Sequence, residues 1–250
     1  MTSTEGEGLW CVVPAAGRGA RFGADVPKQY QMLAGKPMLL RTIERLATHP
    51  RITGIVVAIA ADDPHWAEIE AAALRTGVRN GEPGPTLQRP ALRTATGGEQ
   101  RADSVLAGLR ALRGNIGDED FVLVHDAARP CVRVDDISRL LDLAIPAGGG
   151  LLAAPLRDTL KRADGSGRVA ATEPRDSRWR ALTPQLFRYG ELIAALESAC
   201  AAGIDATDEA MAMERAGHRP LLVEGSEGNI KVTTPDDLAL AAFILARQTE

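Results

Sequence analysis

The chain has 250 residues, 45% of them apolar, with 29 Lys and Arg against 33 Asp and Glu and a formal net charge of −4 at pH 7. This composition excludes a mainly disordered chain and favours a soluble globular fold, which we expect to form a single domain over residues 1–250. The charge argues against a long nucleic acid or an anionic membrane as partner, but it leaves a small anionic ligand open.

The first eight residues are acidic and polar, and they lack the positive start and the apolar run of a signal peptide. No stretch approaches the ~20 apolar residues that span a bilayer. The cysteines Cys11, Cys131 and Cys200 are far apart and form no Cys-x-x-Cys pair, so neither a disulfide framework nor a zinc site is indicated. We therefore expect a cytoplasmic protein without a membrane partner.

Apolar runs alternate with amphipathic segments along most of the chain, a pattern typical of parallel strands that are covered by crossover helices. Helical spacing of apolar residues predicts helices over 38–47 and 104–112. Together these elements predict an α/β fold with a twisted, mainly parallel sheet and helices on both faces. The predicted strands are Leu9–Val13, Gly54–Ala60, Phe121–Val124, Leu151–Ala154 and Leu221–Val223.

Several segments between these elements carry turn or capping signals. Asp63-Pro64 and Thr234-Pro235 predict helix starts, while residues 80–96, rich in Gly, Pro and Thr, predict a surface loop. In residues 156–178 a turn signal at 164–167 lies between polar, strand-length pieces, which predicts a protruding β-hairpin arm. Because an isolated two-stranded hairpin is marginally stable, we expect this arm to dimerise with a second copy of the chain.

A glycine-rich loop follows the first strand. It reads Pro14-Ala15-Ala16-Gly17-Arg18-Gly19-Ala20-Arg21-Phe22-Gly23, and Pro27-Lys28-Gln29 comes shortly after it. Small residues let backbone N–H groups approach a phosphate, although such a turn is also ordinary connection geometry. The interleaved cations Arg18, Arg21 and Lys28 supply a counter-charge and favour a polyphosphate ligand.

Two common phosphate-binding loops fit this segment poorly. The chain has no Gly-x-x-x-x-Gly-Lys-Ser/Thr motif, which disfavours a P-loop kinase or ATPase. The loop has Gly-x-Gly-x-x-x-Gly spacing, and the acidic Asp62 lies 43 residues past Gly19, where a dinucleotide fold places one after about 20. A dehydrogenase is therefore the weaker hypothesis.

The glycine loop and Pro27-Lys28-Gln29 resemble the signature of the 2-C-methyl-D-erythritol 4-phosphate cytidylyltransferases, within the nucleotidyltransferases of Rossmann-like fold. The resemblance covers roughly residues 9–247, and the joint occurrence of its motifs is highly specific. The further matching motifs are Gly97-Gly98-Glu99-Gln100-Arg101-Ala102-Asp103-Ser104-Val105, His125-Asp126-Ala127-Ala128-Arg129-Pro130, Asp158-Thr159-x-Lys161, Ala181-Leu182-Thr183-Pro184-Gln185, Thr207-Asp208-Glu209 and Asn229-Ile230-Lys231-Val232-Thr233.

This resemblance implies a role for particular residues. For the nucleotide it implies Ala15, Ala16, Gly17, Gly19, Gly98, Glu99, Arg101, Ser104, Asp126, Ala127 and Arg129. For the sugar phosphate it implies Asp126, Thr159, Arg175, Thr183, Thr207 and Lys231, with Arg175 reaching the neighbouring subunit's site. For catalysis it implies Arg21, Lys28, Arg175 and Lys231.

Most of these residues also have an ordinary structural interpretation. Ser104 near a helix start fits a simple cap, His125 fits a satisfied interior histidine and is left out of the site, and Asp208-Glu209 fits an acidic first helical turn. Asp126 follows a strand at the sheet edge where α/β folds place ligands, although it also fits a turn cap. On the arm, Arg178 and Arg180 are alternatives to Arg175.

The implied reaction joins CTP to a polyol phosphate and releases pyrophosphate. The attacking oxygen is already anionic near neutral pH, so the work falls to cations and positioning instead of a catalytic base. Mg²⁺ is expected on the CTP phosphates, with few or no protein ligands. Three alternatives stay open: a related enzyme that uses another polyol phosphate such as ribitol 5-phosphate, one that uses another base, and a nucleotide-binding protein without catalytic activity.

Overall fold

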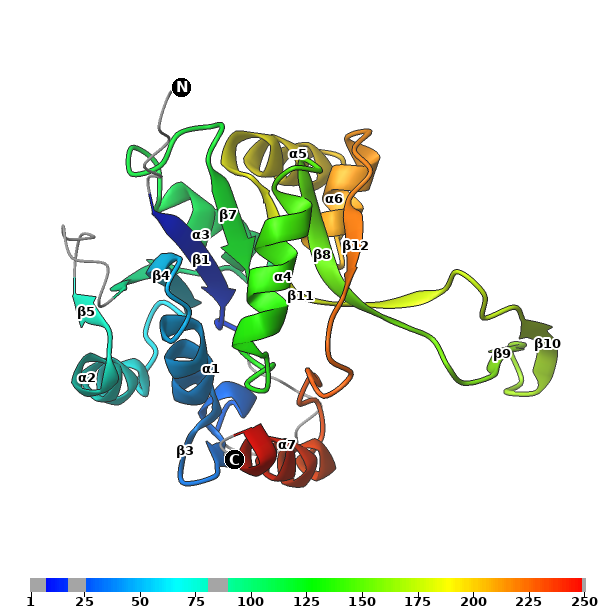
Figure 1. Ribbon diagram of the computed structural model, residues 1–250, viewed down its shortest axis with the longest axis horizontal. Helices are drawn as coiled ribbons and strands as arrows, with labels where there is room; N and C mark the ends of the chain where they lie inside the picture. The colour runs from blue at the N-terminus through cyan, green and yellow to red at the C-terminus, as the bar shows by residue number, and fades with distance from the viewer. Residues whose placement is uncertain (1–7, 18–25, 81–89, 249–250) are drawn as a thin grey trace.

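The computed structural model describes residues 8–17, 26–80 and 90–248, which form a central sheet with helices on both faces (Figure 1). Its described strands follow the order β12, β8, β11, β7, β1, β4, β6 and β5. Only β11 runs antiparallel to its neighbours, β7 and β8, among these described strands. The strand bounds are β1 Leu9–Pro14, β4 Ile52–Ile59, β5 Arg79–Asn80, β6 Ala91–Thr96, β7 Phe121–Val124, β8 Gly149–Pro155, β11 Trp179–Arg188 and β12 Leu221–Glu224.

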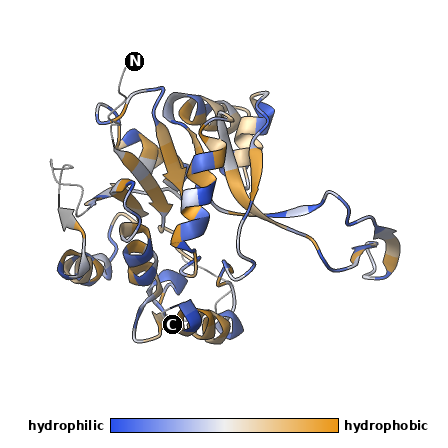
Figure 2. Cartoon of the chain, viewed as in Figure 1, coloured by the Kyte–Doolittle hydropathy of each residue, from blue (hydrophilic) through white to orange (hydrophobic). Residues whose placement is uncertain are grey.

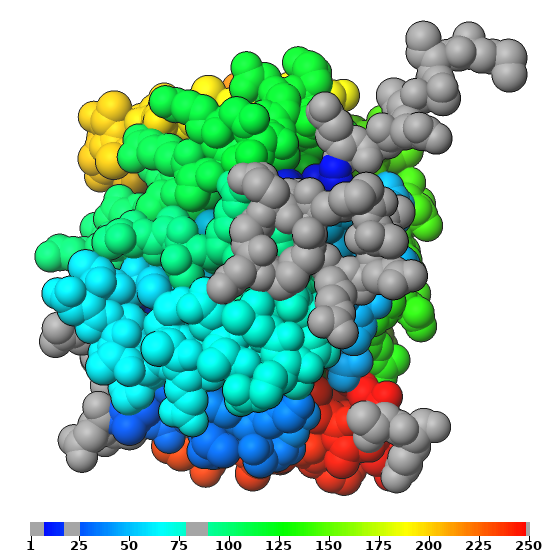
Figure 3. Space-filling model, turned by 90° about the vertical axis from the view of Figure 1, so that its left-hand side faces the viewer, coloured from blue at the N-terminus to red at the C-terminus, as the bar shows by residue number. Residues whose placement is uncertain are grey.

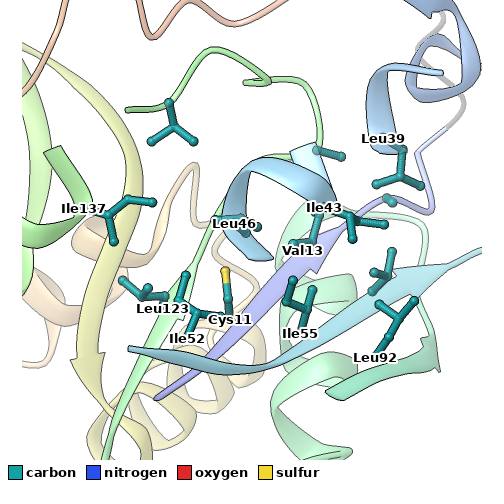
Figure 4. Close-up of a cluster of buried hydrophobic side chains, with 14 of the residues drawn as sticks. Cys11, Val13, Leu39, Ile43, Leu46, Ile52, Ile55, Leu92, Leu123 and Ile137 are labelled. Carbon is teal, nitrogen blue, oxygen red and sulfur yellow. The ribbon is translucent and has the colours of Figure 1, made fainter. Parts of the chain in front are cut away.

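The alternation of side chains along β1 divides the core into two layers. Cys11 and Val13 pack with α1, α2 and α4 on one face, whereas Trp10 and Val12 pack with α3, α5 and α6 on the other. Figure 4 shows the first layer, and the sheet stands out as hydrophobic in Figure 2. The helix bounds are α1 Met38–Ala47, α2 Trp66–Thr76, α3 Arg101–Arg110, α4 Val134–Ala144, α5 Tyr189–Ala201 and α6 Glu209–Arg215.

Two smaller groups of elements lie outside the sheet. A single 3-10 turn, η2 (Lys28–Tyr30), leads into the short hairpin of β2 (Met32–Leu33) and β3 (Lys36–Pro37). The C-terminal helix α7 (Pro235–Gln248) packs its buried residues Ala241 and Leu245 in a third cluster that includes Leu33 and Met38. These elements bring the chain that follows β1 and the chain that precedes α7 to the same end of the sheet (Figure 1).

The predicted arm is present and extends away from the sheet (Figure 1). It consists of β9 (Leu160–Ala163) and β10 (Val169–Glu173), which pair antiparallel. The turn predicted at 164–167 closes it, because the Asp164 carboxylate accepts hydrogen bonds from the backbone of Ser166 and Arg168. The mainly parallel sheet, the helices on both faces and the protruding hairpin were all predicted correctly.

Two local predictions need correction. Residues 91–96, which were expected to belong to a loop, form β6 in parallel register with β4; Thr and Leu side chains in this segment suit a strand despite the Gly and Pro before it. Asn80, at the other end of the predicted loop, is the last residue of β5, and residues 81–89 lie outside the described residues. Helix α2 begins at Trp66, two residues after Pro64, because the Asp63 carboxylate accepts from the His65 N–H in a preceding turn.

The predicted helix start at Thr234-Pro235 is correct, since α7 begins at Pro235 and the Asp237 carboxylate accepts from the backbone N–H groups of Thr233 and Thr234. These bonds hold the pKa of Asp237 at about 2.

In the described part of the chain, none of the helices combines the length and the apolar character that crossing a bilayer requires.

Candidate active site

A pocket of about 170 Å³ lies at the carboxyl ends of β1 and β7, where α/β sheets place ligands. Its wall is built from four stretches of chain: the loop after β1, the η2 turn, the start of α3 and the loop after β7, with one side chain from the segment before α7. The residues predicted from the sequence that line it are Ala15, Ala16, Gly17, Lys28, Glu99, Arg101, Ser104, Asp126, Ala127 and Lys231.

Close packing brings the loop after β1 against the start of α3. A side chain at Gly97 would overlap Ala16 and Ser104, since an added Cβ would lie 2.6 Å from the Ala16 Cβ and 2.7 Å from the Ser104 hydroxyl oxygen. At Gly98, an added Cβ would lie 2.4 Å from the Asp103 Cβ. These two glycines are therefore required by packing, whereas Gly17 lines the pocket and has open space beside it.

Ser104 is not the cap that its sequence position suggested, because Gln100 is the N-cap of α3. It is buried, and its hydroxyl donates within the helix start, to the carbonyl oxygens of Gln100 at 3.2 Å and Gly98 at 3.4 Å. Its side chain also lines the pocket. Serine at this position therefore stabilises the local backbone at the pocket wall.

Asp126 is the centre of the charged cluster at the pocket. Its Oδ1 accepts from Arg101 Nε at 2.8 Å, its Oδ2 lies 2.9 Å from Lys231 Nζ, and Arg129 Nε is 3.5 Å from the same oxygen. Burial by itself would raise the pKa of Asp126, but the charges of Arg101, Lys231 and Arg129 outweigh burial and hold it well below its usual value. The carboxylate is therefore ionised in the folded protein, and it orients cations rather than moving protons.

Glu209 is a member of this cluster that the sequence interpretation missed. Its side chain is fully buried and binds Arg101 through both oxygens, at 2.6 and 3.0 Å. The neighbouring Asp208 is the helix cap, accepting from the Met211 N–H at 2.9 Å, so only one of the two acids serves the first turn of α6. The motif Thr207-Asp208-Glu209 was recognised in the sequence, but nothing in it distinguished Glu209 from an ordinary acid of a first helical turn.

His125 is an interior histidine, as predicted, and its hydrogen bonds fix its state. The Arg129 carbonyl can only accept, so Nε2 donates to it at 3.0 Å, and Nδ1 is then left to accept from the Thr183 hydroxyl at 3.0 Å. The Thr183 oxygen in turn accepts the Asp126 N–H. Burial lowers the pKa of His125 to about 4, so this imidazole is neutral near pH 7.

The other predicted residues lie away from the pocket lining or outside the described chain. Thr183 is buried beneath Asp126, and Arg129 is buried with its guanidinium donating to the Asn229 carbonyl at 2.7 Å. Thr207 is exposed at the start of α6, and Thr159 and Arg175 are exposed on the arm. Gly19 and Arg21, with Arg18, lie outside the described residues.

Gln29 is a second residue that the sequence interpretation missed. Its side chain lines the pocket and is 5% exposed, and its Nε2 donates to the Ala15 carbonyl at 2.7 Å. The bond ties the η2 turn to the loop after β1. Pro14, Gln100 and Ala128 also line the pocket and were not predicted.

No cluster of three carboxylate, imidazole or thiol groups suited to a metal ion occurs among the residues that the structure describes. Both oxygens of Asp126 already face cations, as do both oxygens of Glu209. The described side chains therefore do not form a cage for a divalent cation.

Known proteins provide a comparison for this chain. Residues 9–247 match the family model described as 2-C-methyl-D-erythritol 4-phosphate cytidylyltransferase. The protein of that name from Xanthomonas campestris pv. campestris (strain 8004) is 54% identical over 244 residues, which are 96% of this chain and 85% of the relative.

Solved structures give the same result. A crystal structure of 4-diphosphocytidyl-2C-methyl-D-erythritol synthase has a TM-score of 0.79 and 32% identity, covering 96% of this chain and 99% of that one. The Francisella tularensis 2-C-methyl-D-erythritol 4-phosphate cytidylyltransferase has a TM-score of 0.76 and 33% identity, covering 95% of this chain and 99% of that one.

Proposed function

The chain belongs to the 2-C-methyl-D-erythritol 4-phosphate cytidylyltransferase family, and we propose that it transfers the cytidylyl group of CTP to 2-C-methyl-D-erythritol 4-phosphate in the non-mevalonate isoprenoid pathway. The products would be 4-diphosphocytidyl-2-C-methyl-D-erythritol and pyrophosphate. The observation that carries the proposal is that the pocket gathers ten residues from the separate motifs of this family, including Lys28, Asp126 and Lys231.

In the proposed reaction an oxygen of the sugar phosphate attacks the α-phosphorus of CTP, and the bond to pyrophosphate breaks. The attacking oxygen is already an anion, so no side chain has to remove a proton. His125 is consistent with this requirement, because it is buried, neutral and satisfied on both ring nitrogens. The barrier then depends on bringing two anions together and on stabilising the charge that develops at phosphorus.

Two lysines in the pocket are suited to these tasks. Lys28 lies beside the loop after β1, where backbone groups would hold the triphosphate, and we assign it to stabilising charge on the phosphates, together with Arg21. Lys231 is held by Asp126 at 2.9 Å, which would aim its ammonium at the attacking phosphate. The start of α3 adds the favourable field of a helix N-terminus.

We propose that Mg²⁺ enters as part of the CTP substrate, bound to the phosphate oxygens. The absence of a suitable carboxylate cluster among the described residues supports this arrangement over a dedicated protein site. Bound there, the ion would neutralise part of the triphosphate charge. A cytoplasmic location and a single nucleotidyltransferase domain over residues 1–250 are parts of the same proposal.

A coupled pyrophosphate-release assay tests the proposed function. We expect release only with CTP, Mg²⁺ and 2-C-methyl-D-erythritol 4-phosphate together, and slower release with ribitol 5-phosphate or other nucleoside triphosphates. CTP binding without pyrophosphate release in the presence of any polyol phosphate would instead support a non-catalytic protein. Faster release with ribitol 5-phosphate would reassign the substrate.

Lys28→Ala tests the catalytic assignment within that assay. Removing one charge-stabilising donor should lower turnover by about 30- to 1,000-fold, equivalent to about 2 to 4 kcal/mol. Lys36→Ala is the matched control, because Lys36 pairs with Glu44 at 2.7 Å and is not part of the pocket lining. Near-normal turnover of the Lys28 variant would exclude its role.

We further propose that the arm joins two copies of the chain and places Arg175 in the neighbouring copy's site, where it grips the sugar phosphate. Two features support this proposal: the hairpin stands away from its own sheet (Figure 1), and Arg175 is exposed and donates to the Arg157 carbonyl on the arm itself. Residues of an isolated hairpin gain little stability without a packing partner.

Mixed dimers test this arrangement. Arg175→Ala and Lys28→Ala should each be impaired alone, whereas a dimer with one copy of each variant should regain activity at one of its two sites. Arg178→Ala and Arg180→Ala, examined in parallel, identify which arginine reaches the substrate. Absence of recovery in dimers verified to be mixed would argue against shared sites.

A further inference from the structure

The η2 turn that carries Lys28 is anchored by the two side chains that follow the lysine. Its backbone closes through Tyr30 N–H to the Pro27 carbonyl at 2.9 Å and Gln31 N–H to the Lys28 carbonyl at 3.1 Å. Lys28 lines the pocket, whereas Gln29 and Tyr30 are buried, at 5% and 6% exposed. A single 3-10 turn has few bonds of its own, so the placement of Lys28 depends on these neighbours.

The two anchors differ in what they hold. Gln29 ties the turn to the pocket wall through the Ala15 carbonyl. Tyr30 ties it to the scaffold outside the pocket, because its hydroxyl donates to Asp63 Oδ2 at 2.6 Å. Burial, followed by the Asp63 carboxylate, raises the pKa of Tyr30, so the hydroxyl keeps its proton and is the donor in this bond.

Asp63 is itself held in place from the opposite side. Its Oδ1 accepts the His65 N–H at 3.0 Å, and the His65 ring lies 4.7 Å from the Tyr30 ring between centroids. Asp63 follows β4, and the Ala58 carbonyl of β4 accepts the Ala15 N–H at 2.7 Å. Strand β4 and the connection that follows it therefore hold the two segments that carry the pocket's small residues and Lys28: Ala58 holds the loop after β1, and Asp63 holds the η2 turn.

The bracing segment belongs to the scaffold and not to the pocket. Neither Tyr30 nor Asp63 lines the cavity. In Figure 3 the cyan segment around α2 lies against the blue segment around α1, in agreement with the contact between these two helices. An effect of these residues on catalysis would therefore act through Lys28 and not through contact with substrate.

We propose that Asp63 and Tyr30 are positioning residues that hold the Lys28 ammonium against the phosphates of CTP. This inference rests on the proposed function, in which Lys28 stabilises the developing charge. Without the Tyr30 hydroxyl, the turn would lose its bond to Asp63, and a small displacement of a charge-stabilising group is enough to cost a large factor in rate. The sugar-phosphate side of the pocket, with Lys231 and Asp126, would not be affected.

The chain contains two tyrosines, which allow a matched comparison. Tyr189 is also buried, at 4% exposed, and its hydroxyl donates to the Leu109 carbonyl at 3.1 Å, away from the pocket lining. Tyr30→Phe should lower kcat about 10- to 100-fold and leave the KM for the sugar phosphate within twofold. Tyr189→Phe should leave kcat unchanged. Equal effects of the two variants on kcat would overturn the proposal.

A double variant separates positioning from general destabilisation. Adding Tyr30→Phe to Lys28→Ala should cause no further loss of kcat, because the group that Tyr30 positions is already gone. If Tyr30 acted through general stability instead, the fold losses in kcat of the two single variants would multiply in the double variant. Asp63→Asn should stay near wild type, since the tyrosine oxygen can accept from the new amide, whereas Asp63→Ala should match Tyr30→Phe. An Asp63→Ala variant with normal kcat would also overturn the proposal.

Failure of the proposed function would be visible separately, in the wild type. If the wild type binds CTP but releases no pyrophosphate, the proposed function fails, and the two tyrosine variants are compared by their Kd for CTP with Mg²⁺. A weaker Kd for Tyr30→Phe beside an unchanged Kd for Tyr189→Phe would still support positioning of Lys28. Equal Kd values would reject it.

Discussion

The pocket and the arm use the same kinds of ion pair in opposite surroundings. At the pocket the carboxylates are covered: the Glu209 side chain is 0% exposed and the Asp126 side chain 8%. On the arm, Arg162 and Glu173 pair at 2.9 Å with side chains 62% and 35% exposed. Water screens the pair on the arm more strongly than the pairs at the pocket, so similar distances correspond to different energies.

Burial also changes what an ion pair does for the molecule. Moving charged groups out of water is costly. Each member of the pocket cluster therefore needs its partners, and each partner fixes the geometry of the next. Glu209 orients Arg101, Arg101 orients Asp126, and Asp126 orients Lys231 at the cavity. The exposed pairs of the arm impose no such order, which leaves its side chains available to a second chain.

Of the variants that test this comparison, Glu209→Ala should cause the largest loss of stability. It would leave Arg101, whose side chain is 24% exposed, paired with Asp126 but not with a second carboxylate. Loss of one partner from a buried pair typically costs about 3 to 5 kcal/mol, so for this half-buried arginine we expect the free energy of unfolding to fall by about 3 kcal/mol. Glu214→Ala, an exposed position on the same helix, is the control and should change stability by less than about 0.5 kcal/mol. Urea denaturation measures both. Similar losses of stability in the two variants would show that the burial of Glu209 does not determine its contribution to the free energy of unfolding.

Acid should weaken the buried region in two successive steps. Near pH 7 His125 is mainly neutral in the folded and in the unfolded chain. Below about pH 6.5, the pKa of a histidine in the unfolded chain, the unfolded chain binds a proton that the folded chain excludes until about pH 4. The contribution of neutral His125 to the free energy of unfolding is thus fully present above about pH 6.5, and it falls by roughly 3 kcal/mol as the pH drops to 4. Asp126, whose pKa is lowered, adds a further loss below about pH 4.

Denaturation curves at pH 7, 5.5 and 4.5 measure this dependence. His125→Gln should be less stable at pH 7 but should lose much less stability on acidification, because glutamine does not titrate. Burial also lowers the pKa of His49, so His49→Gln gives its contribution to the slope separately. An unchanged slope in the His125 variant would contradict the assignment.

The sequence predicted the sheet, the arm and most of the pocket wall for identifiable physical reasons. Apolar periodicity marks the strands, and Gly17, Lys28 and Asp126 lie in the loops and the short turn that follow strands, where α/β folds place ligand-binding residues. β6 escaped detection because its six residues alternate Ala, Thr and Arg with a single Leu, and its identity depends on pairing with β4.

The missed site residues depend on contacts between distant parts of the chain. Glu209 looks like any acid in a first helical turn until α6 is placed against Arg101, 108 residues away. Thr183 was predicted to contact substrate, and the structure instead records its bonds to Asp126 and His125, 57 and 58 residues away. Its role toward the sugar phosphate stays a prediction.

Arg162→Ala on the arm should have the smallest effect. An exposed pair contributes about 0.2 to 1 kcal/mol, so the unfolding free energy of the isolated chain should fall by no more than that. If the arm packs against a second copy, the pair becomes partly covered there, and the loss should grow with protein concentration as dimers form. Unfolding measured across a dilution series tests this expectation. A loss above 2 kcal/mol at every concentration would mean that the arm is already ordered by its own chain, and the contrast with the pocket would disappear.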